Sequence, residues 1–300
     1  MALFTYDDGS RRESLLDIIR DISPIASNYL VDHLSTSEAT NTLHEWVVRN
    51  ISRPTSDNNT AEGTGLVDAA GDAPVRSNNV TAIYKRDVIV SGTEEQARRA
   101  LPGSAMKDEK AIKLLRLKAD MEFGILRGAK ASGASGTARG MAGIVNCIST
   151  NITARSSGTS LSVTELEDIL EESWNGAANG FQADTILVPM GLKRKIASFT
   201  TSVTRYTDDA GRIYNDVSVY EGSSAMVKVI PHRDVLNSAG TTHLIAIREE
   251  LFRIAFFRQP DFKMAGLDGD RERGFYVTEL TVESLFQAAS VRRTGYAQQG

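Results

Sequence analysis

Apolar residues recur with the spacing of a helix most clearly over residues 108–127. The residues that would form one broad apolar face are Leu114, Leu115, Leu117, Met121, Ile125 and Leu126. On the polar side, Arg116–Asp120 and Lys118–Glu122 are pairs four residues apart, as in stabilising ion pairs, and Gly128 follows as a helix terminator. The pattern predicts a helix about 30 Å long, at about 1.5 Å per residue, which is enough to span a whole domain.

The N-terminal residues predict two short helices with narrow apolar faces. Ser10 and Glu13 have the spacing of a capping box, in which each side chain bonds the backbone N–H of the other residue. The apolar residues that follow at helical spacing are Leu15, Ile18, Ile19 and Ile22. Ser23 and Pro24 suit the start of a second short helix. Because neither helix has a compact partner nearby in the sequence, we expect an arm that docks elsewhere.

Residues 45–84 have the pattern of a projecting hairpin. Residues 45–51 and 80–84 are strand-like, and the second run continues toward Val90. Between them, residues 52–79 are polar with almost no large apolar side chain, although unstructured loops beyond about 12–15 residues are uncommon inside compact domains. Two strands with a long polar tip cannot bury their own faces, so we expect this hairpin to lie on a neighbouring molecule.

The second half of the chain mixes helical and strand patterns. Ser162 and Glu165 form another capping box, and the helix that follows reaches about Ala178. We expect Trp174 to point inward from this helix. The later strand-like segments are 184–189, 217–220, 226–230, 243–247, 251–257 and 275–290, with one helix near 192–199. Residues 292–295 are expected to close the chain as a polar tail, and the pattern as a whole is α+β.

Composition narrows the range of functions. The 300 residues are 41% hydrophobic and 24% charged, which supports a sizeable core and excludes global disorder. A net charge of -4 argues against a protein that sheathes nucleic acid. Cys147 is the single cysteine, which excludes an intrachain disulfide framework and a multi-cysteine metal site. No apolar run reaches the ~18 residues of a membrane helix, and residues 1–10 lack the apolar stretch of a secretory signal.

No motif supports catalysis. The Gly-rich segment 128–143 follows a helix and has no Gly-Lys-Ser/Thr, so a joint is favoured over a phosphate loop. Residues 268–272 lack the alternating ligands of a calcium loop. The histidines, none of which has His-Glu-x-x-His spacing, are His33, His44, His232 and His243. We expect no catalytic, cofactor-binding or metal-binding residues and no enzymatic activity, with Cys147 as a small buried side chain.

Arginine and lysine are distributed unevenly along the chain. Lys85 is the first lysine, and every cation before it is arginine. Arginine is enriched in protein interfaces and lysine is depleted, although codon usage would give the same pattern. The residues selected as candidate contacts between subunits are Arg11, Arg12, Trp46, Arg49, Arg53, Leu66, Val67 and Arg76.

Seven short segments share their order with one known family. They are residues 8–15, 22–24, 45–46, 137–144, 253–258, 264–270 and 276–283. With the order of elements, they make the chain resemble the major capsid, or major head, proteins of tailed bacteriophages, which have the Hong Kong 97-type capsid fold. Each segment alone is weakly specific, whereas their order over nearly the whole chain is fairly specific.

The resemblance implies an α+β, Hong Kong 97-like division of the chain into four parts. These are an N-terminal arm at 1–44, an extended loop at 45–84, a peripheral domain at 85–140 and 251–300, and an axial domain at 141–250. The peripheral domain would contain a spine helix at 108–127. The turn at 201–216 is expected to lie nearest the fivefold and sixfold axes.

The resemblance also implies a function and partners. The chain would self-assemble, as hexamers and pentamers, into the icosahedral head shell of a tailed bacteriophage around packaged double-stranded DNA. Further partners would be a portal protein, a decoration or scaffolding protein, and DNA in non-specific contact with the inner surface, without a membrane. The shell would be assembled in the host bacterial cytoplasm and become part of the virion, and no cofactor is implied.

The sequence departs from the capsid resemblance in one respect, and two alternative functions remain open. Some capsids of this fold link subunits through a lysine in the extended loop, but residues 45–84 contain no lysine, so that amine is missing. An encapsulin-type bacterial nanocompartment shares the fold. An α+β hydrolase with a dispersed site is the alternative from another class, and it would be a monomer or small oligomer with a polar pocket.

Overall fold

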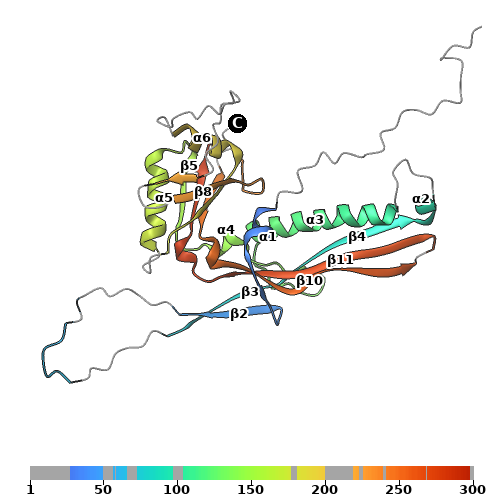
Figure 1. Ribbon diagram of the computed structural model, residues 1–300, viewed down its shortest axis with the longest axis horizontal. Helices are drawn as coiled ribbons and strands as arrows, with labels where there is room; N and C mark the ends of the chain where they lie inside the picture. The colour runs from blue at the N-terminus through green and yellow to red at the C-terminus, as the bar shows by residue number, and fades with distance from the viewer. Residues whose placement is uncertain are drawn as a thin grey trace, which may run out of the picture.

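The computed structural model describes residues 28–49, 57, 59–65, 73–96, 104–176, 181–199, 219–222, 226–238, 241–267 and 269–297. Within them the chain forms three sheets (Figure 1). A four-stranded long sheet extends to the right in Figure 1, a six-stranded wide sheet lies at the upper left, and a two-stranded hairpin points to the lower left. The helices are α1 (Tyr29–His33), α2 (Gly92–Gln96), α3 (Ala105–Arg127), α4 (Ile144–Cys147), α5 (Val163–Gly176) and α6 (Met190–Phe199), with 3-10 helices η2 (Glu249–Leu251) and η3 (Gln287–Ala289).

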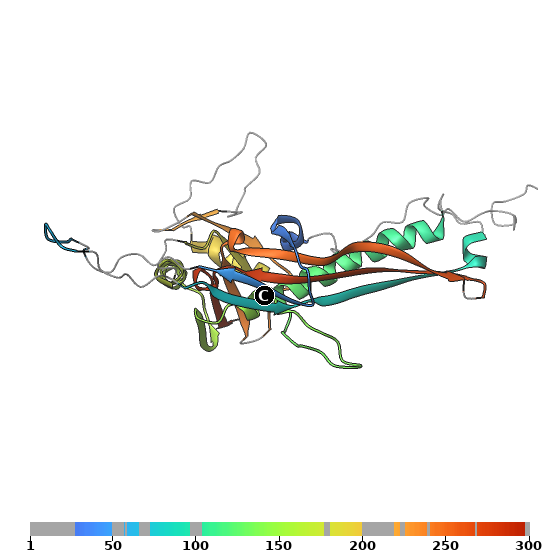
Figure 2. The ribbon, with the colours of Figure 1, turned by 90° about the horizontal axis from the view of Figure 1, so that it is seen from below.

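The long sheet has the strand order β1-β10-β11-β4. Its strands are β1 (Ser35–Glu38), β10 (Phe252–Leu267), β11 (Arg271–Ser284) and β4 (Ala82–Ser91). β10 and β11 are antiparallel, and their pairing is bulged at three places. The strand expected at 251–257 continues to Leu267, well beyond its apolar part. Figure 2 shows α3 running along the length of these strands.

α3 confirms the helix predicted at 108–127, and it begins earlier, at Ala105. Ser104 caps it, because its side chain accepts a hydrogen bond from the backbone N–H of Lys107. The helix lies close to β4 at Gly124, where a Cβ atom would stand 1.8 Å from the hydroxyl oxygen of Tyr84. A side chain at this position would therefore force the Tyr84 ring to move.

The wide sheet has the strand order β5-β12-β9-β6-β8-β7. Its strands are β5 (Ile152–Thr159), β12 (Val291–Tyr296), β9 (Thr242–Ile247), β6 (Thr185–Val188), β8 (Met226–Pro231) and β7 (Val219–Glu221). On β9, Leu244 and Ala246 join the buried cluster under α5 and α6. Ile245 and Ile247 join a second cluster with α1, α3, α4 and the long sheet. One continuous core therefore connects the two larger sheets.

The C-terminal strand overturns one expectation. Residues 292–295 are part of β12, which lies between β9 and β5, so they are not a polar tail, and this part of 251–300 belongs to the wide sheet. Arg293 is buried but forms an ion pair with Glu172 of α5, and Tyr296 is fully buried. Gly295 has a φ of 96°, and a Cβ atom there would lie 2.3 Å from the carbonyl oxygen of Arg155. The polar sequence did not predict a strand, because the partner that allows Arg293 to be buried comes from another element.

Other expectations also need correction. Trp174 is 48% exposed and does not point into the core. Residues 35–38 lie within the expected arm and form a strand that the sequence pattern did not predict, β1, which pairs in parallel with β10. The hairpin consists of β2 (Leu43–Val48) and β3 (Val75–Val80), and the chain leaves it at Thr81 for the long sheet, so its strands end before Tyr84. The wide-sheet strand β5 had no clear pattern in the sequence, because small polar residues dominate it.

Candidate assembly surfaces

The base of the hairpin is fixed to the end of β11 by two side chains of β2. Trp46 donates its indole N–H to the backbone oxygen of Ser284 at 3.1 Å. His44 Nε2 lies 2.6 Å from Oε1 of Glu283, which also accepts a hydrogen bond from Ser37 at 2.7 Å. These contacts hold the hairpin at a set angle to the long sheet. His44 is thus structural.

A buried amide secures the second strand of the hairpin. Asn79 is 1% exposed, and its Nδ2 donates to the carbonyl oxygens of Ala142 and Val282 at 3.0 and 2.8 Å. Its Oδ1 accepts from the backbone N–H of Ala142 at 2.9 Å. One side chain therefore joins the hairpin, β11 and the segment before α4. A buried amide with all these partners satisfied fixes one geometry.

The hairpin exposes apolar side chains at its base and along its length. Leu43, Val47 and Val75 are 46%, 63% and 62% exposed. Val47 lies opposite Arg76, and Arg76 forms an exposed pair with Glu45 at 3.4 Å, which solvent screens. A two-stranded ribbon cannot cover such residues by itself. The hairpin therefore presents a mixed apolar and charged surface for a contact outside this chain.

Only some of the candidate contact residues fall in the described part. Trp46 lies at the base of the hairpin and bonds its own chain, while Arg49 and Arg76 are exposed along the hairpin. Arg11, Arg12, Arg53, Leu66 and Val67 lie outside the described residues, as does the turn expected at 201–216. Within the described part of the hairpin, the exposed apolar residues not among the candidates are Leu43, Val47 and Val75. Alternation along β2 was the signal for the first two.

A buried carboxylate ties the start of the described chain to α3 and to the end of a strand of the wide sheet. Glu122 of α3 was expected on the polar side of the helix, but it is 1% exposed. Its oxygens accept the backbone N–H groups of Leu30 and Val31 at 2.7 and 2.8 Å. His232, after β8, lies 2.7 Å from the same carboxylate. Its Nδ1 accepts the backbone N–H of Asp234 at 3.1 Å, so Nε2 carries the proton that is donated to Glu122.

A second buried carboxylate lies under the Gly-rich segment. Glu279 of β11 accepts hydrogen bonds from Thr81 and Arg139 at 2.6 Å each, and from Arg258 Nε at 3.0 Å. Arg139 belongs to a narrow hairpin in which Ala131 pairs with Gly140. The segment expected as a joint is therefore attached to the long sheet at its base. The paired cations offset the cost of burying the carboxylate.

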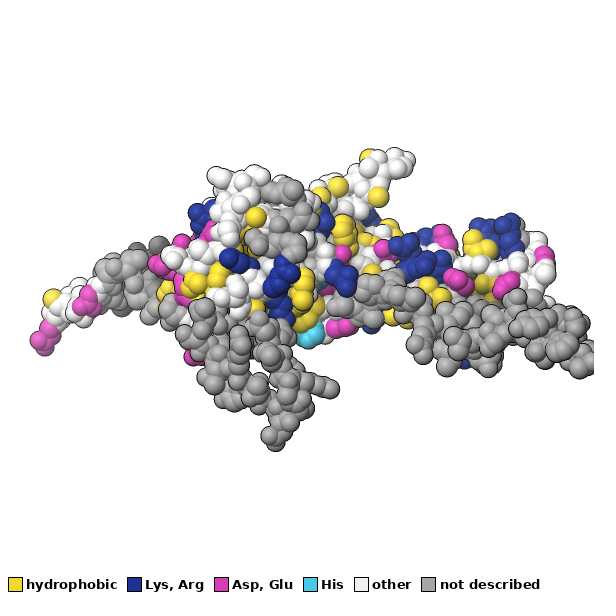
Figure 3. Space-filling model, turned by 90° about the horizontal axis from the view of Figure 1, so that it is seen from above, with side chains coloured by type: hydrophobic (Ala, Val, Ile, Leu, Met, Phe, Trp, Pro, Cys, Tyr) yellow, Lys and Arg dark blue, Asp and Glu magenta, His cyan; other side chains and the backbone are white. Residues whose placement is uncertain are grey.

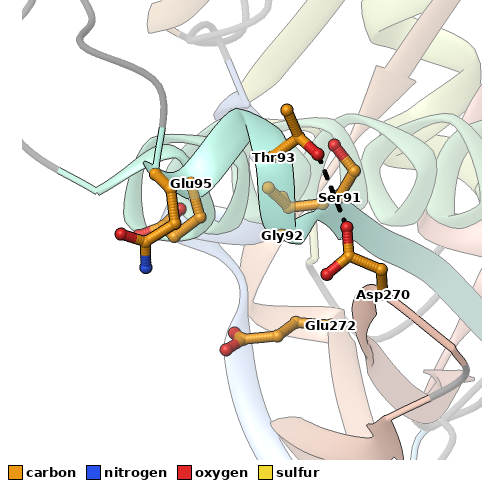
Figure 4. A pocket seen from close by; sticks show the side chains of 8 residues that line it. Ser91, Gly92, Thr93, Glu95, Asp270 and Glu272 are labelled. Carbon is orange, nitrogen blue, oxygen red and sulfur yellow. Dashed lines mark hydrogen bonds between the residues drawn. The ribbon is translucent and has the colours of Figure 1, made fainter.

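The hollow at the far end of the long sheet has an acidic lining (Figure 4). It has a volume of about 640 Å³ and lies between α2 and the β10–β11 turn, with Glu95, Asp270 and Glu272 among its lining residues. Asp270 holds the turn to α2, because its carbonyl oxygen accepts the N–H of Gly92 at 2.7 Å. Among the described residues, no group of three or more His, Cys, Asp or Glu side chains is placed to hold a metal ion.

The single cysteine has no activated thiol. Cys147 is partly buried at the end of α4 and packs against the core shared by the two large sheets. Burial raises the pKa of its thiol to about 11, against a smaller opposing effect of Lys130. The thiolate form that a nucleophile requires is therefore scarce near neutral pH. In the described part of the chain, no helix is both long and apolar enough to span a membrane.

The comparisons with known proteins point to one family. The family model described as SU10 major capsid protein matches residues 3–297. No curated protein matches the chain in sequence.

Solved shell proteins share the fold at low identity. The capsid of a native GTA particle aligns with a TM-score of 0.66 at 12% identity, covering 98% of each chain. The capsid of Myoviridae phage XM1 aligns with a TM-score of 0.64 at 11% identity, covering 94% of this chain and 96% of that one. The SrpI encapsulin of Synechococcus elongatus PCC 7942 aligns with a TM-score of 0.64 at 11% identity, covering 96% of this chain and 94% of that one.

These likenesses establish the Hong Kong 97-type fold that the sequence analysis predicted. The family assignment rests on the sequence match, which spans almost the entire chain. The chain therefore belongs to the SU10 major capsid protein family, and it is a structural protein of a phage head shell.

Proposed function

We propose that copies of this chain assemble, as hexamers and pentamers, into the icosahedral head of a tailed bacteriophage that encloses double-stranded DNA. The observation that carries this proposal is the hairpin, which is fixed at its base by Trp46 and Asn79 and exposes Val47 and Val75 beyond it. A rigid base and an uncovered apolar end suit an element that reaches over an adjacent copy.

The proposed division of the chain follows the resemblance, with one change. Residues 1–44 are the N-terminal arm and 45–84 the extended loop. Residues 85–140 and 251–290 form the peripheral domain around the spine helix α3. Residues 141–250 form the axial domain, to which β12 adds residues 291–296 because it pairs with β9 and β5.

The proposed partners complete a virion. They are further copies of this chain, a portal protein, a decoration or scaffolding protein, and the packaged DNA. A net charge of -4 supports weak, non-specific contact with DNA at the inner wall, because strong phosphate binding would hinder filling. The shell would form in the host bacterial cytoplasm. We assign the protein no enzymatic activity, and the raised thiol pKa of Cys147 supports this assignment.

The encapsulin alternative has one supporting observation, the structural likeness to the SrpI encapsulin at a TM-score of 0.64. At 11% identity that likeness concerns the fold alone. The sequence match over residues 3–297 is to a capsid family, and it favours a phage head.

The test is the assembly state of the purified protein. We expect light scattering and negative-stain microscopy to show capsomers or shells rather than the 32.6 kDa monomer. Variants Val47→Ser and Val75→Ser should lower assembly, whereas Lys85→Gln, a change at an exposed site outside the hairpin, should not. A well-folded monomer at every salt and protein concentration would overturn the proposed function.

A further inference from the structure

The two helices that cover one face of the wide sheet carry opposite charge. α5 contains five carboxylates and no cation, and α6 contains three cations and no carboxylate. Both helices bury apolar residues in the same cluster, so their remaining sides face outward. Figure 1 places α5 along the left edge of the wide sheet and α6 at its top, so the two charged sides lie at different borders of the molecule.

Three of the α5 carboxylates are already used within the chain. Glu165 pairs with a cation of β5, Glu172 pairs with Arg293, and Glu167 accepts the hydroxyl of Tyr220 at 2.5 Å. The two that remain, Asp168 and Glu171, are exposed and stand three residues apart on one stripe.

No described residue forms a short polar contact with the two exposed carboxylates of α5. Asp168 makes no hydrogen bond or ion pair with any described residue, and Glu171 has only a long contact of 3.4 Å from Asn175. Trp174 lies on the same stripe and is 48% exposed. Acidic groups beside an uncovered tryptophan are a surface that suits a protein partner, because tryptophan is enriched among the residues that dominate binding energy.

α6 offers the complementary stripe. Met190, Arg194 and Ser198 are exposed and stand four residues apart, and Met190 is 70% exposed. Arg194 has no ion pair within the described residues, while Lys195 extends over the ring of Phe199 at 5.7 Å. Seen from above, groups of Lys and Arg side chains stand out on the surface of the molecule (Figure 3). This stripe pairs a free guanidinium with a polarisable methionine.

We propose that α5 of one copy packs against α6 of the next copy around each ring of the shell. Asp168 and Glu171 would meet Arg194, and Trp174 would cover Met190. Because the two surfaces are different and lie at different borders, the contact is heterologous, which is the kind that closes rings. This inference rests on the proposed function and names the surfaces that the axial domains use.

A charge exchange tests the contact. Arg194→Glu should lower the assembled fraction by about tenfold, because like charges would then face each other, and Asp168→Arg should do the same. The double variant Arg194→Glu with Asp168→Arg should restore assembly to about the wild-type level. Native mass spectrometry of capsomers and negative-stain microscopy give the readout, and thermal unfolding of the subunit checks that each variant is folded.

Two further variants complete the experiment. Lys228→Glu is the matched control, since Lys228 is an exposed cation of the same sheet outside both helices, and it should assemble normally. Arg194→Ala replaces Arg194→Glu if the latter does not fold, and it should also lower assembly. The proposed contact would be overturned by any of three results. These are normal assembly of the single variants, an equal loss of assembly in Lys228→Glu, and a double variant that does not recover assembly. If the wild type itself stays monomeric, the proposed function fails instead.

Discussion

At the scale of residues, buried polar groups join parts of the chain that are far apart in sequence. Glu122 connects α1, α3 and the end of β8, and Glu279 connects β11 with Arg139 and Arg258. Each carboxylate is almost fully buried, so the loss of a hydrogen-bond partner would leave a buried polar group unsatisfied. The network positions the arm, the hairpin and the two large sheets relative to one another.

The pH dependence of stability provides a prediction at this scale. Burial lowers the pKa of His243, the nearby charges of Arg292 and Arg127 add to this effect, and together they bring the pKa to about 4. Between about pH 6.5 and pH 4 the unfolded chain therefore binds more protons than the folded one, and stability falls as the pH falls. Because the side chain is only partly buried, we expect a loss on the order of 2 kcal/mol through that window, and none above it.

The measurement compares the wild type with His243→Gln. Thermal unfolding near pH 7 and near pH 5 should show a larger drop for the wild type, because the variant lacks the titrating group. Other groups titrate equally in both proteins, so the difference between the two curves isolates His243. Parallel curves would contradict the assignment.

At the scale of elements, the hairpin is separable from the core. Removing residues 54–74 leaves a five-residue connection between Val48 and Val75, which pair in the intact hairpin. Loop shortening changes the free energy of unfolding by only about 0.6 kcal/mol per halving of length. We therefore expect a subunit that folds with nearly unchanged thermal stability but no longer forms shells.

The control for this deletion is a variant in which residues 54–74 are replaced by an equally long Gly/Ser segment. If the sequence of the segment makes the contact, this variant should also fail to assemble, whereas the subunit should stay folded. Electron microscopy of the products and thermal unfolding of the subunit give the two readouts. Normal shells from the deletion would show that the segment is no assembly element, and a large loss of stability would show that it belongs to the core.

At the scale of the whole molecule, subunits should be held together without covalent bonds. Residues 45–84 contain no lysine, so the extended loop has no amine for an isopeptide bond. Lys130 Nζ does lie 2.6 Å from Oδ1 of Asn78, but both belong to one chain, so a bond between them would not join two copies. Denaturing gels of assembled shells should show one band near 32.6 kDa. A ladder of multimers that survives boiling and reductant would contradict this prediction.

The sequence by itself determined the local elements and the family. Apolar spacing predicted α3, and a capping box with apolar spacing predicted α5, each to within a few residues, because helix formation depends on neighbours close in the chain. Alternation before residue 49 revealed the first hairpin strand. The order of short segments was sufficient for the resemblance to phage capsid proteins, which the family match over residues 3–297 confirms.

Only the tertiary structure decided which surfaces are covered. Residues 292–295 look polar, yet β12 is an internal strand because Glu172 of another element neutralises Arg293. Trp174 looks like a core residue, but the sheet lies on the other side of α5. Strand pairing and burial depend on residues that are distant in the chain. The periodicity of the sequence indicates only that one face of an element is apolar, without indicating what covers that face. The surfaces left uncovered, on the hairpin, α5 and α6, follow from that long-range packing.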